Sequence, residues 1–306
     1  MGGVAVKMIG SVPVEVSAES EYARLVSGRF GVSISTNNTD PEVRLEVSSA
    51  TSEVPDRDPD YADAVRTWSE PGRFVLAAGS ATAVVESDVI SVGGPLDSEN
   101  DEIAIDCLLQ SALAIRLSDR DRLLAHGAAV ARDSSGILIV GGSGRGKSTA
   151  AAAAMFGGWR LLADDLVVVD LAGPRITGVL RPPMLMPSLV EGTEFAGGAD
   201  SVVGDRRQRL RLPASVLDDR TYELEAVVVV DHGDARGGLD PLISGSLDIV
   251  QGALAVDPAP AVVRKMLPGL ARLAALPTFR LSHAREESER LDRALEMLDE
   301  VYGLVH

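Results

Sequence analysis

A glycine-rich segment between two apolar stretches is the feature that most constrains the fold of this chain. It follows the apolar run 137–140 and precedes the alanine-rich run 149–156. Four apolar residues before a glycine-rich turn are typical of a buried parallel strand, and alanine favours a helix. Residues 141–148 match the pattern G-x-x-x-x-G-K-[ST], whose backbone N–H groups and following helix N-terminus surround phosphate oxygens. The order of strand, loop and helix therefore predicts a nucleotide- or phosphate-binding site.

The residue types of this loop each have a chemical reason for their place. In loops of this kind the lysine, here Lys147, reaches the β- and γ-phosphates, and the hydroxyl of Ser148 can bind Mg²⁺. The alternative is a glycine- and serine-rich loop that matches the pattern by chance, which the flanking strand and helix disfavour. The residues predicted to contact the nucleotide are Gly141, Gly142, Ser143, Gly144, Arg145, Gly146, Lys147, Ser148 and Thr149.

Two adjacent carboxylates, Asp164 and Asp165, lie within an apolar stretch that is predicted to be the next buried strand. Neighbouring residues on a strand point to opposite faces, so one carboxylate can face the phosphates while the other turns away, unless the strand ends or bulges at the pair. A buried carboxylate needs a partner, which Mg²⁺ or an acceptor hydroxyl would supply. The roles open to the pair are metal ligand and general base for an attacking hydroxyl. The alternative is a pair that caps a turn at the end of a strand.

The stretch resembles a known family. Its segments Gly-x-Ser-Gly-x-Gly-Lys-Ser and Gly-x-Arg-Leu-x-Ala-Asp-Asp, joined by an alanine-rich helix, are similar to the nucleotide-binding core of HPr kinase/phosphorylase and its serine-kinase relatives. Upstream, His126-Gly127 is similar to the family's His-Gly strand. These proteins share the phosphoenolpyruvate carboxykinase-like P-loop fold, and the likeness covers about residues 105–170. It implies a kinase that uses ATP and Mg²⁺ and acts on a serine-type hydroxyl.

The resemblance also implies roles for single residues. Asp164 would be the catalytic carboxylate with His126 beside it, and Asp165 and Ser148 would hold Mg²⁺, although the order within the carboxylate pair stays open. Thr149 replaces a glutamate that HPr kinases often carry, and the chain lacks their C-terminal signature of arginine and asparagine. HPr is therefore disfavoured as acceptor, and the looser relatives that act on precursor peptides or free amino acids fit better. The alternative function is a nucleotide-binding regulatory protein without kinase activity.

A histidine and a basic cluster complete the candidate site. A histidine on an apolar strand, such as His126, is usually a core residue, but its near-neutral pKa would also suit contact with phosphate or with Asp164. In the basic segment 205–212, strand alternation would place Arg207, Arg209 and Arg211 on one face. Such a row would either neutralise charge during phosphoryl transfer or protect an edge strand. Arg207 and Arg209 are the two that the resemblance favours.

Composition and charge limit the possible partners. The chain has 306 residues, with 45% hydrophobic and 24% charged residues, as in a globular protein of one or two domains. A net charge of −16 argues against nucleic acid or an anionic membrane as the main partner. No stretch has the length of a membrane span or the pattern of a signal peptide, which predicts a cytoplasmic protein that binds nucleotide and a hydroxyl acceptor. A homo-oligomer remains open.

The N-terminal third has a different pattern from the rest. Apolar residues alternate with polar ones over 43–47, and short apolar runs on both sides of Gly79 predict a hairpin. A glycine- and proline-containing boundary at 93–95 precedes Ser98, which is predicted to cap a helix that packs on the sheet of the second domain. We therefore predict an α/β protein with a β-rich N-terminal lobe, residues 1–97, and a P-loop kinase-like domain of the HPr kinase type, residues 98–306.

Overall fold

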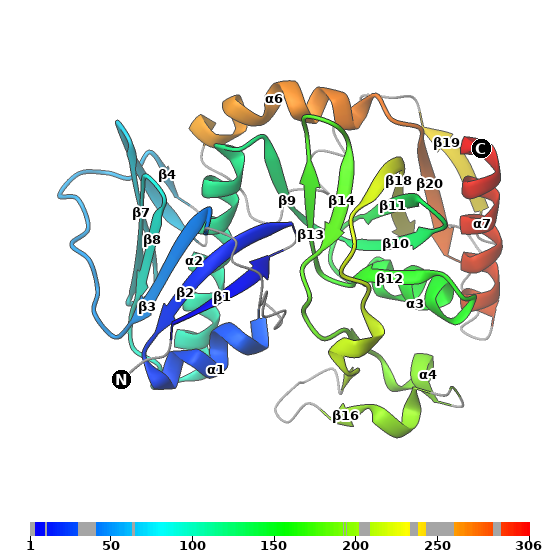
Figure 1. Cartoon of the computed structure of the whole chain (residues 1–306), viewed down its shortest axis with the longest axis horizontal. Helices are drawn as coiled ribbons and strands as arrows, with labels where there is room; N and C mark the ends of the chain where they lie inside the picture. Colours follow the sequence, from blue (N-terminus) through cyan, green and yellow to red (C-terminus); the bar gives the residue numbers. More distant parts are fainter. Residues whose placement is uncertain are drawn as a thin grey trace. The chain divides into compact units, whose positions relative to one another are not determined.

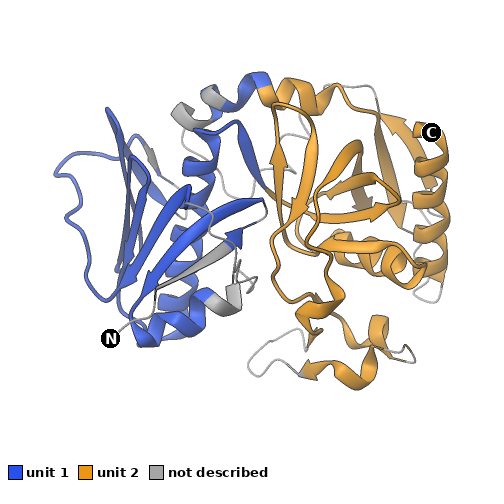
Figure 2. Cartoon of the chain, viewed as in Figure 1, with its two compact units in different colours: residues 1–124, 254–268 blue, residues 125–253, 269–306 orange. Residues whose placement is uncertain are grey.

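The computed structural model describes residues 4–9, 11–29, 41–62, 65–191, 193, 195–201, 209–232, 238–242, 260–283 and 289–306. The chain divides into two compact units (Figure 2). Unit 1 comprises Met1–Leu124 with Leu254–Pro268, and unit 2 comprises Ala125–Ala253 with Gly269–His306. This division differs from the predicted boundary between residues 97 and 98. The predicted α/β class is confirmed, because both strands and helices build the units.

Unit 1 contains an eight-stranded mixed sheet with the order β1-β2-β3-β8-β7-β6-β5-β4 (Figure 1). Its strands are β1 (Val4–Ile9), β2 (Val12–Ala18), β3 (Val43–Ser48), β4 (Tyr61–Ala62), β5 (Arg66–Glu70), β6 (Arg73–Ala78), β7 (Ala81–Glu86) and β8 (Val89–Gly93). Strand β3 is parallel to β2 and to β8, whereas the other neighbours are antiparallel. Buried and exposed residues alternate along β3, and β6 and β7 form a hairpin around Gly79, as the sequence predicts.

Two helices belong to unit 1, α1 (Ser20–Arg29) and α2 (Glu99–Ser118). The predicted cap of α2 is confirmed, because the Ser98 hydroxyl accepts a hydrogen bond from the backbone N–H of Asp101. The prediction that this helix packs on the sheet of the second domain is wrong: α2 packs on β6, β7 and β8. These strands come immediately before α2 in the chain, and their sheet has an apolar face that the apolar side of α2 covers.

Unit 2 is built around a nine-stranded sheet. Seven strands have the order β12-β10-β11-β18-β14-β13-β9, while β20 pairs with both β18 and β19. The strands are β9 (Arg122–His126, which spans the limit between the units), β10 (Ala128–Arg132), β11 (Ser135–Val140), β12 (Arg160–Ala163), β13 (Leu166–Asp170), β14 (Arg175–Gly178), β18 (Tyr222–His232), β19 (Gly238–Leu242) and β20 (Thr278–His283). Strand β18 is parallel to β11 and to β20, so their carboxyl ends meet at one edge of the sheet.

Helices and a small sheet surround this core. Helices α3 (Lys147–Phe156) and α7 (Arg290–Val305) pack against each other, and their apolar residues join one core cluster with the strands. A three-stranded sheet has the order β15-β17-β16, formed by β15 (Met184–Leu185), β16 (Asp200–Ser201) and β17 (Leu210–Arg211). The remaining elements of unit 2 are α4 (Pro187–Val190) and the 3₁₀ turns η1 (Ala196–Gly198) and η2 (Ala214–Val216). Helix α6 (Pro260–Ala274) belongs to unit 1 as far as Pro268 and to unit 2 from Gly269. Among the described residues, no helix combines the length and the apolar character needed to cross a membrane.

Candidate functional site at the glycine-rich loop

The glycine-rich loop lies between β11 and α3, as the sequence predicts. Three of its glycines have positive φ angles: 149° at Gly141, 76° at Gly144 and 102° at Gly146. A side chain at Gly141 would also be too close to strand β18, because a Cβ atom there would lie 2.5 Å from the carbonyl oxygen of Val230. Glycine is therefore required by the curvature of the loop and by its contact with the sheet.

Two contacts attach the loop to the ends of the parallel strands. The guanidinium of Arg145 lies 3.2 Å from the carboxylate of Asp231 near the end of β18. The Nε2 atom of His283, the last residue of β20, lies 3.0 Å from the carbonyl oxygen of Gly146. His283 is buried and fills the space beside Gly146, where a Cβ atom would lie 2.3 Å from Nε2. The loop thus occupies the carboxyl edge of the parallel strands, the usual ligand-binding edge of such sheets.

Lys147 is turned towards the backbone of the loop. Its Nζ atom donates hydrogen bonds to the carbonyl oxygens of Gly141, at 2.8 Å, and Gly142, at 3.3 Å. The side chain is buried, and burial lowers the pKa of Lys147, while the charges of Asp165 and Asp164 oppose this shift. The two carboxylates therefore favour the charged form of the lysine, whereas its burial disfavours that form.

The carboxylate pair lies in the bend between β12 and β13 and not on a strand. Strand alternation therefore does not apply to the pair, because the strand ends there. The charges of both act on Lys147, and the hydroxyl of Ser148 donates a hydrogen bond to Asp164. The strand breaks there because β12 pairs with β10, whereas β13 pairs with β14.

Asp164 is buried and only partly satisfied. Its Oδ2 atom accepts a hydrogen bond of 3.3 Å from the backbone N–H of Met184. Its Oδ1 atom is fully buried and has no hydrogen-bond partner among the described residues. Burial raises the pKa of Asp164 to about 6, although the Ser148 hydrogen bond and the charge of Arg209 lower it. The carboxyl group therefore has one acceptor atom available for a proton, a hydroxyl or a cation.

Asp165 has stronger partners. Its Oδ2 atom lies 2.5 Å from Nη1 of Arg181, and its Oδ1 atom lies 3.2 Å from Nδ1 of His126. Burial raises the pKa of Asp165, but the His126 hydrogen bond and the charges of Arg181, His126 and Lys147 outweigh it and lower the pKa to about 2. Asp165 is therefore a permanent anion near neutral pH.

The structure brings together most of the predicted site residues. Lys147, Ser148, Asp164, Asp165 and His126 are linked by the contacts above. The charge of Arg209 acts on Asp164, so this arginine is also near the carboxylates. The predicted row of three arginines lies only partly within the described residues: β17 contains Leu210 and Arg211, Arg209 precedes it, and Arg207 lies outside the part that the structure describes.

Arg181 and His283 have positions in the site that the sequence analysis did not predict. Arg181 follows β14 and begins an Arg-Pro-Pro segment whose extended backbone leads to Met184. His283 ends β20, and no sequence motif marks this histidine. The antiparallel pairing of β13 with β14 brings Arg181 to Asp165, and the parallel pairing of β20 with β18 brings His283 to the loop.

The donor groups fit a nucleotide-bound Mg²⁺ better than a metal held by protein alone. Among the residues that the structure describes, no group of three or more His, Cys, Asp or Glu side chains could hold a metal ion. Mg²⁺ in nucleotide sites uses one or two protein ligands, and phosphate oxygens and water complete its shell. Ser148 and the carboxylate pair, with the buried and unpartnered Oδ1 of Asp164, meet this smaller requirement.

Comparisons with known proteins include a distant structural likeness. No protein-family model and no curated protein sequence matches the chain. Among solved structures, the chain is similar to the Hpr(Ser) kinase/phosphatase from Coxiella burnetii, with 12% sequence identity and a TM-score of 0.29. The alignment covers 59% of this chain and 92% of that one. Because a TM-score this low carries no argument, we base the function on the residues of the site.

Proposed function

We propose that this chain is a kinase that transfers the γ-phosphate of ATP, bound with Mg²⁺, to a serine-type hydroxyl of a peptide, a protein or a small metabolite. The observation that carries the proposal is the contact between the two halves of the site. Ser148, in the first turn of the helix that follows the glycine-rich loop, hydrogen-bonds the carboxylate of Asp164, and the Oδ1 atom of this carboxylate is buried without a partner among the described residues. Phosphate-binding groups and an available carboxylate oxygen therefore meet at one point.

The loop and α3 would hold the nucleotide. The positive φ angles of Gly141, Gly144 and Gly146 let successive backbone N–H groups point to one side, and the N-terminus of α3 adds its partial positive charge. Lys147 would leave its two carbonyl partners and bind the β- and γ-phosphates. Arg209, whose charge already acts on Asp164, would stabilise the negative charge of the transferred group.

We assign the proton-accepting role to Asp164. Its buried Oδ1 atom is available, whereas both oxygens of Asp165 already bind Arg181 or His126. A pKa of about 6 also makes Asp164 the stronger base of the two. As the acceptor oxygen bonds to the γ-phosphorus, its proton passes to Asp164, and the bond from phosphorus to the leaving ADP oxygen breaks with its electron pair on ADP.

Ser148 and Asp165 would hold Mg²⁺, which screens the phosphate charges when bound. The hydrogen bond between Ser148 and Asp164 supports a different division, with Asp164 beside the metal. Asp164→Asn and Asp165→Asn distinguish the two. Loss of the carboxylate that binds Mg²⁺ should raise the Mg²⁺ concentration needed for half-maximal activity about tenfold or more. Loss of the base should lower kcat at every Mg²⁺ concentration. If Asp164→Asn alone shifts the Mg²⁺ requirement, the assignments must be exchanged.

The first experiment measures ADP release with ATP and Mg²⁺, with and without a pool of acceptors. The pool contains free serine, free threonine and serine-containing peptides, and GTP replaces ATP in a parallel series. We expect acceptor-dependent ADP release that falls about 100-fold or more in Lys147→Ala and in Asp164→Asn. Asp164→Asn should still bind ATP. Mass spectrometry of the pool then identifies the phosphorylated acceptor.

The alternative is a nucleotide-binding regulatory protein. It predicts tight binding of ATP or GTP and no turnover with any acceptor. That result, or full activity of Asp164→Asn, would contradict the proposed kinase reaction.

A further inference from the structure

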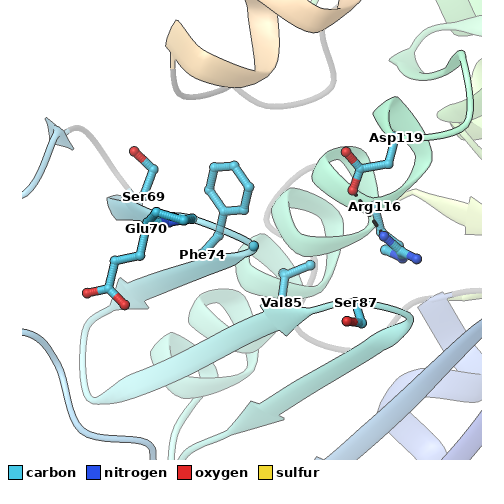
Figure 3. A pocket seen from close by; sticks show the side chains of 9 residues that line it. Ser69, Glu70, Phe74, Val85, Ser87, Arg116 and Asp119 are labelled. Atoms are coloured by element: carbon cyan, nitrogen blue, oxygen red, sulfur yellow. Dashed lines mark hydrogen bonds and ion pairs between the residues drawn. The ribbon is translucent and has the colours of Figure 1, made fainter.

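Unit 1 contains a pocket of about 550 Å³ at the C-terminal end of α2 (Figure 3). The turn between β5 and β6, the turn between β7 and β8, and the last turn of α2 form its walls. Its volume falls within the range of roughly 300–1,000 Å³ that is usual for small-molecule sites. None of its lining residues belongs to the glycine-rich loop, so the pocket does not depend on the proposed function.

The walls of the pocket differ in chemistry. Phe74 and Val85, on strands β6 and β7, provide apolar surface, while Arg116 and Asp119 at the end of α2 provide charge (Figure 3). Glu70 also lines the pocket, but its carboxylate lies 3.4 Å from the guanidinium of Arg73. A mixed lining of this kind suits a ligand with an apolar body and one polar end.

Arg116 indicates which chemical group the polar end of the ligand would carry. Its side chain is 13% exposed, and Nη1 donates a hydrogen bond of 3.0 Å to Asp119. Its Nε atom is fully buried and has no hydrogen-bond partner among the described residues. A guanidinium can bind a carboxylate or phosphate through the edge that carries Nε and Nη2, separately from the Nη1 atom used by Asp119. The unpaired group is thus a cationic donor, which requires an anionic acceptor.

An ordinary structural role accounts for only part of this arrangement. An arginine in the last turn of a helix favours the helix dipole, and Asp119 compensates its charge. However, Arg120 and Arg122 lie close to Arg116 and share the carboxylate of Glu42, at 3.3 and 2.8 Å. Burial lowers the pKa of Arg120, and the positive charges of Arg116 and Arg122 lower it further. An anion bound to Arg116 would relieve this repulsion.

Ser87 provides a second, independent observation. It lies in the turn between β7 and β8 and has a φ angle of 46°, which glycine or asparagine adopts more easily. Its side chain nevertheless lines the pocket. Strained positions of this kind are concentrated at functional sites, where the residue type is needed for contact with a ligand.

We propose that this pocket binds a small organic anion, a carboxylate or a phosphate, whose oxygens pair with Arg116 and Ser87 and whose apolar group packs on Phe74 and Val85. The occupant is a low-molecular-weight ligand with a planar or branched apolar part, since Phe74 offers the face of a ring. Carboxylate and phosphate share the acceptor chemistry, and the probes below distinguish them.

The test measures binding of four probes to the full chain by ligand-observed NMR and calorimetry. Phenylacetate and phenyl phosphate carry both parts of the proposed ligand, phenylacetamide lacks the charge, and acetate lacks the ring. For ligands of this size we expect one or both aromatic anions to bind with a Kd of roughly 1 mM or tighter. Phenylacetamide and acetate should each bind about tenfold more weakly. Equal binding of phenylacetamide, or no binding of either aromatic anion, would overturn the proposal.

Variants locate the bound probe. Arg116→Gln should weaken binding about tenfold, because it removes the charge and keeps a similar shape. The matched control is Arg293→Gln, which removes another arginine that pairs with a carboxylate three residues later, and its Kd should equal that of the unmodified chain. If Arg116→Gln does not fold, Ser87→Ala and Phe74→Leu replace it, and each should weaken binding about threefold. Unchanged binding in these pocket variants would place the probe elsewhere and contradict the proposal.

Discussion

Asp164 and Asp165 are neighbours in the chain, and the residues around them shift their pKa values in opposite directions. Asp164 is buried beside Ser148 and Met184, and its pKa rises, whereas Asp165 lies between Arg181 and His126, and its pKa falls. The difference follows from their partners: burial disfavours both charged forms, but at Asp165 the His126 hydrogen bond and the nearby positive charges outweigh burial, whereas at Asp164 the Ser148 hydrogen bond and the charge of Arg209 do not. A carboxyl group whose burial is not fully compensated should reduce the stability of the fold when it is ionised.

This gives a prediction for Asp164→Asn. The folded-state pKa of about 6 lies above the ordinary value of 3.8, so ionisation of Asp164 opposes folding. The free energy of unfolding should therefore fall as the pH rises from about 4 to about 6 and stay lower above it. At neutral pH, Asp164→Asn should raise the free energy of unfolding by at most about 3 kcal/mol while it abolishes transfer.

Urea unfolding of both proteins in EDTA, at several pH values between about 5 and 8, checks this prediction. The advantage of the variant should become smaller as the pH falls towards about 5, because the carboxyl group of the folded, unmodified chain then takes up a proton and no longer buries a charge. A variant that is less stable than the unmodified chain across this range would contradict the prediction.

At the scale of elements, the loop depends on the strand that supports it. Gly144 and Gly146 both have positive φ angles, but only a Cβ atom at Gly146 would collide with His283. Gly144→Ala should therefore cost only the free energy of the strained backbone, about 1–2 kcal/mol. Gly146→Ala should also displace the loop, and it should therefore weaken nucleotide binding much more. The measurement is the Kd for ATP with Mg²⁺.

A double variant isolates the contact with His283. In the His283→Ala background the space beside residue 146 is open, so Gly146→Ala should weaken ATP binding less than it does in the unmodified chain. Gly144→Ala should have the same effect in both backgrounds, because nothing lies within 4 Å of its Cβ position. If Gly146→Ala weakens ATP binding by the same factor in both backgrounds, His283 does not position the loop.

The packing of α7 on α3 provides a third prediction. Leu298 is fully buried in the core cluster, whereas Leu304 on the same helix is 62% exposed. Leu298→Ala should lower the free energy of unfolding by about 2–5 kcal/mol, and Leu304→Ala should change it by less than about 0.5 kcal/mol. Urea unfolding followed by far-UV circular dichroism measures both. Similar decreases in the free energy of unfolding for the two variants would contradict the orientation of α7.

At the scale of the whole molecule, each unit contains one of the two tryptophans of the chain. Trp68 is buried in unit 1 with Val75, Ala77 and Val84, and Trp159 is buried in unit 2 against Tyr302. Trp159→Phe and Trp68→Phe therefore leave a fluorescence reporter in one unit at a time. Such a pair of reporters tests whether the units unfold separately.

We expect ADP with Mg²⁺ to raise the unfolding midpoint reported by Trp159, and phenylacetate to raise the midpoint reported by Trp68. A ligand at about 100 times its Kd adds about 2.7 kcal/mol to the unit that binds it. Phenylacetamide, which carries no phosphate and lacks the charge proposed for the ligand of the unit 1 pocket, is the control. Equal shifts of both midpoints with either ligand would show that the units unfold as one. If ADP raised the midpoint reported by Trp68, or phenylacetate the one reported by Trp159, the proposed sites would be contradicted.

Local patterns in the sequence were sufficient to predict the glycine-rich loop, the cap of α2, the alternating strand β3 and the β6–β7 hairpin. These features depend on neighbouring residues: positive φ angles require glycine, a serine hydroxyl binds the N–H three positions later, and a half-buried strand alternates. The mixed α/β class follows from the same patterns.

Contacts between distant parts of the chain determine the remaining features, which are the assembly of the site, the packing of α2 and the pocket in unit 1. The break between β12 and β13 places both carboxylates near the loop, and the position of β20 next to β18 brings His283 to Gly146. Likewise, α2 covers the sheet of unit 1, and the pocket beside Arg116 forms between two hairpin turns and the end of that helix. Such contacts join residues that are far apart in the chain, and they depend on which apolar surfaces are available to be covered, which no local pattern contains.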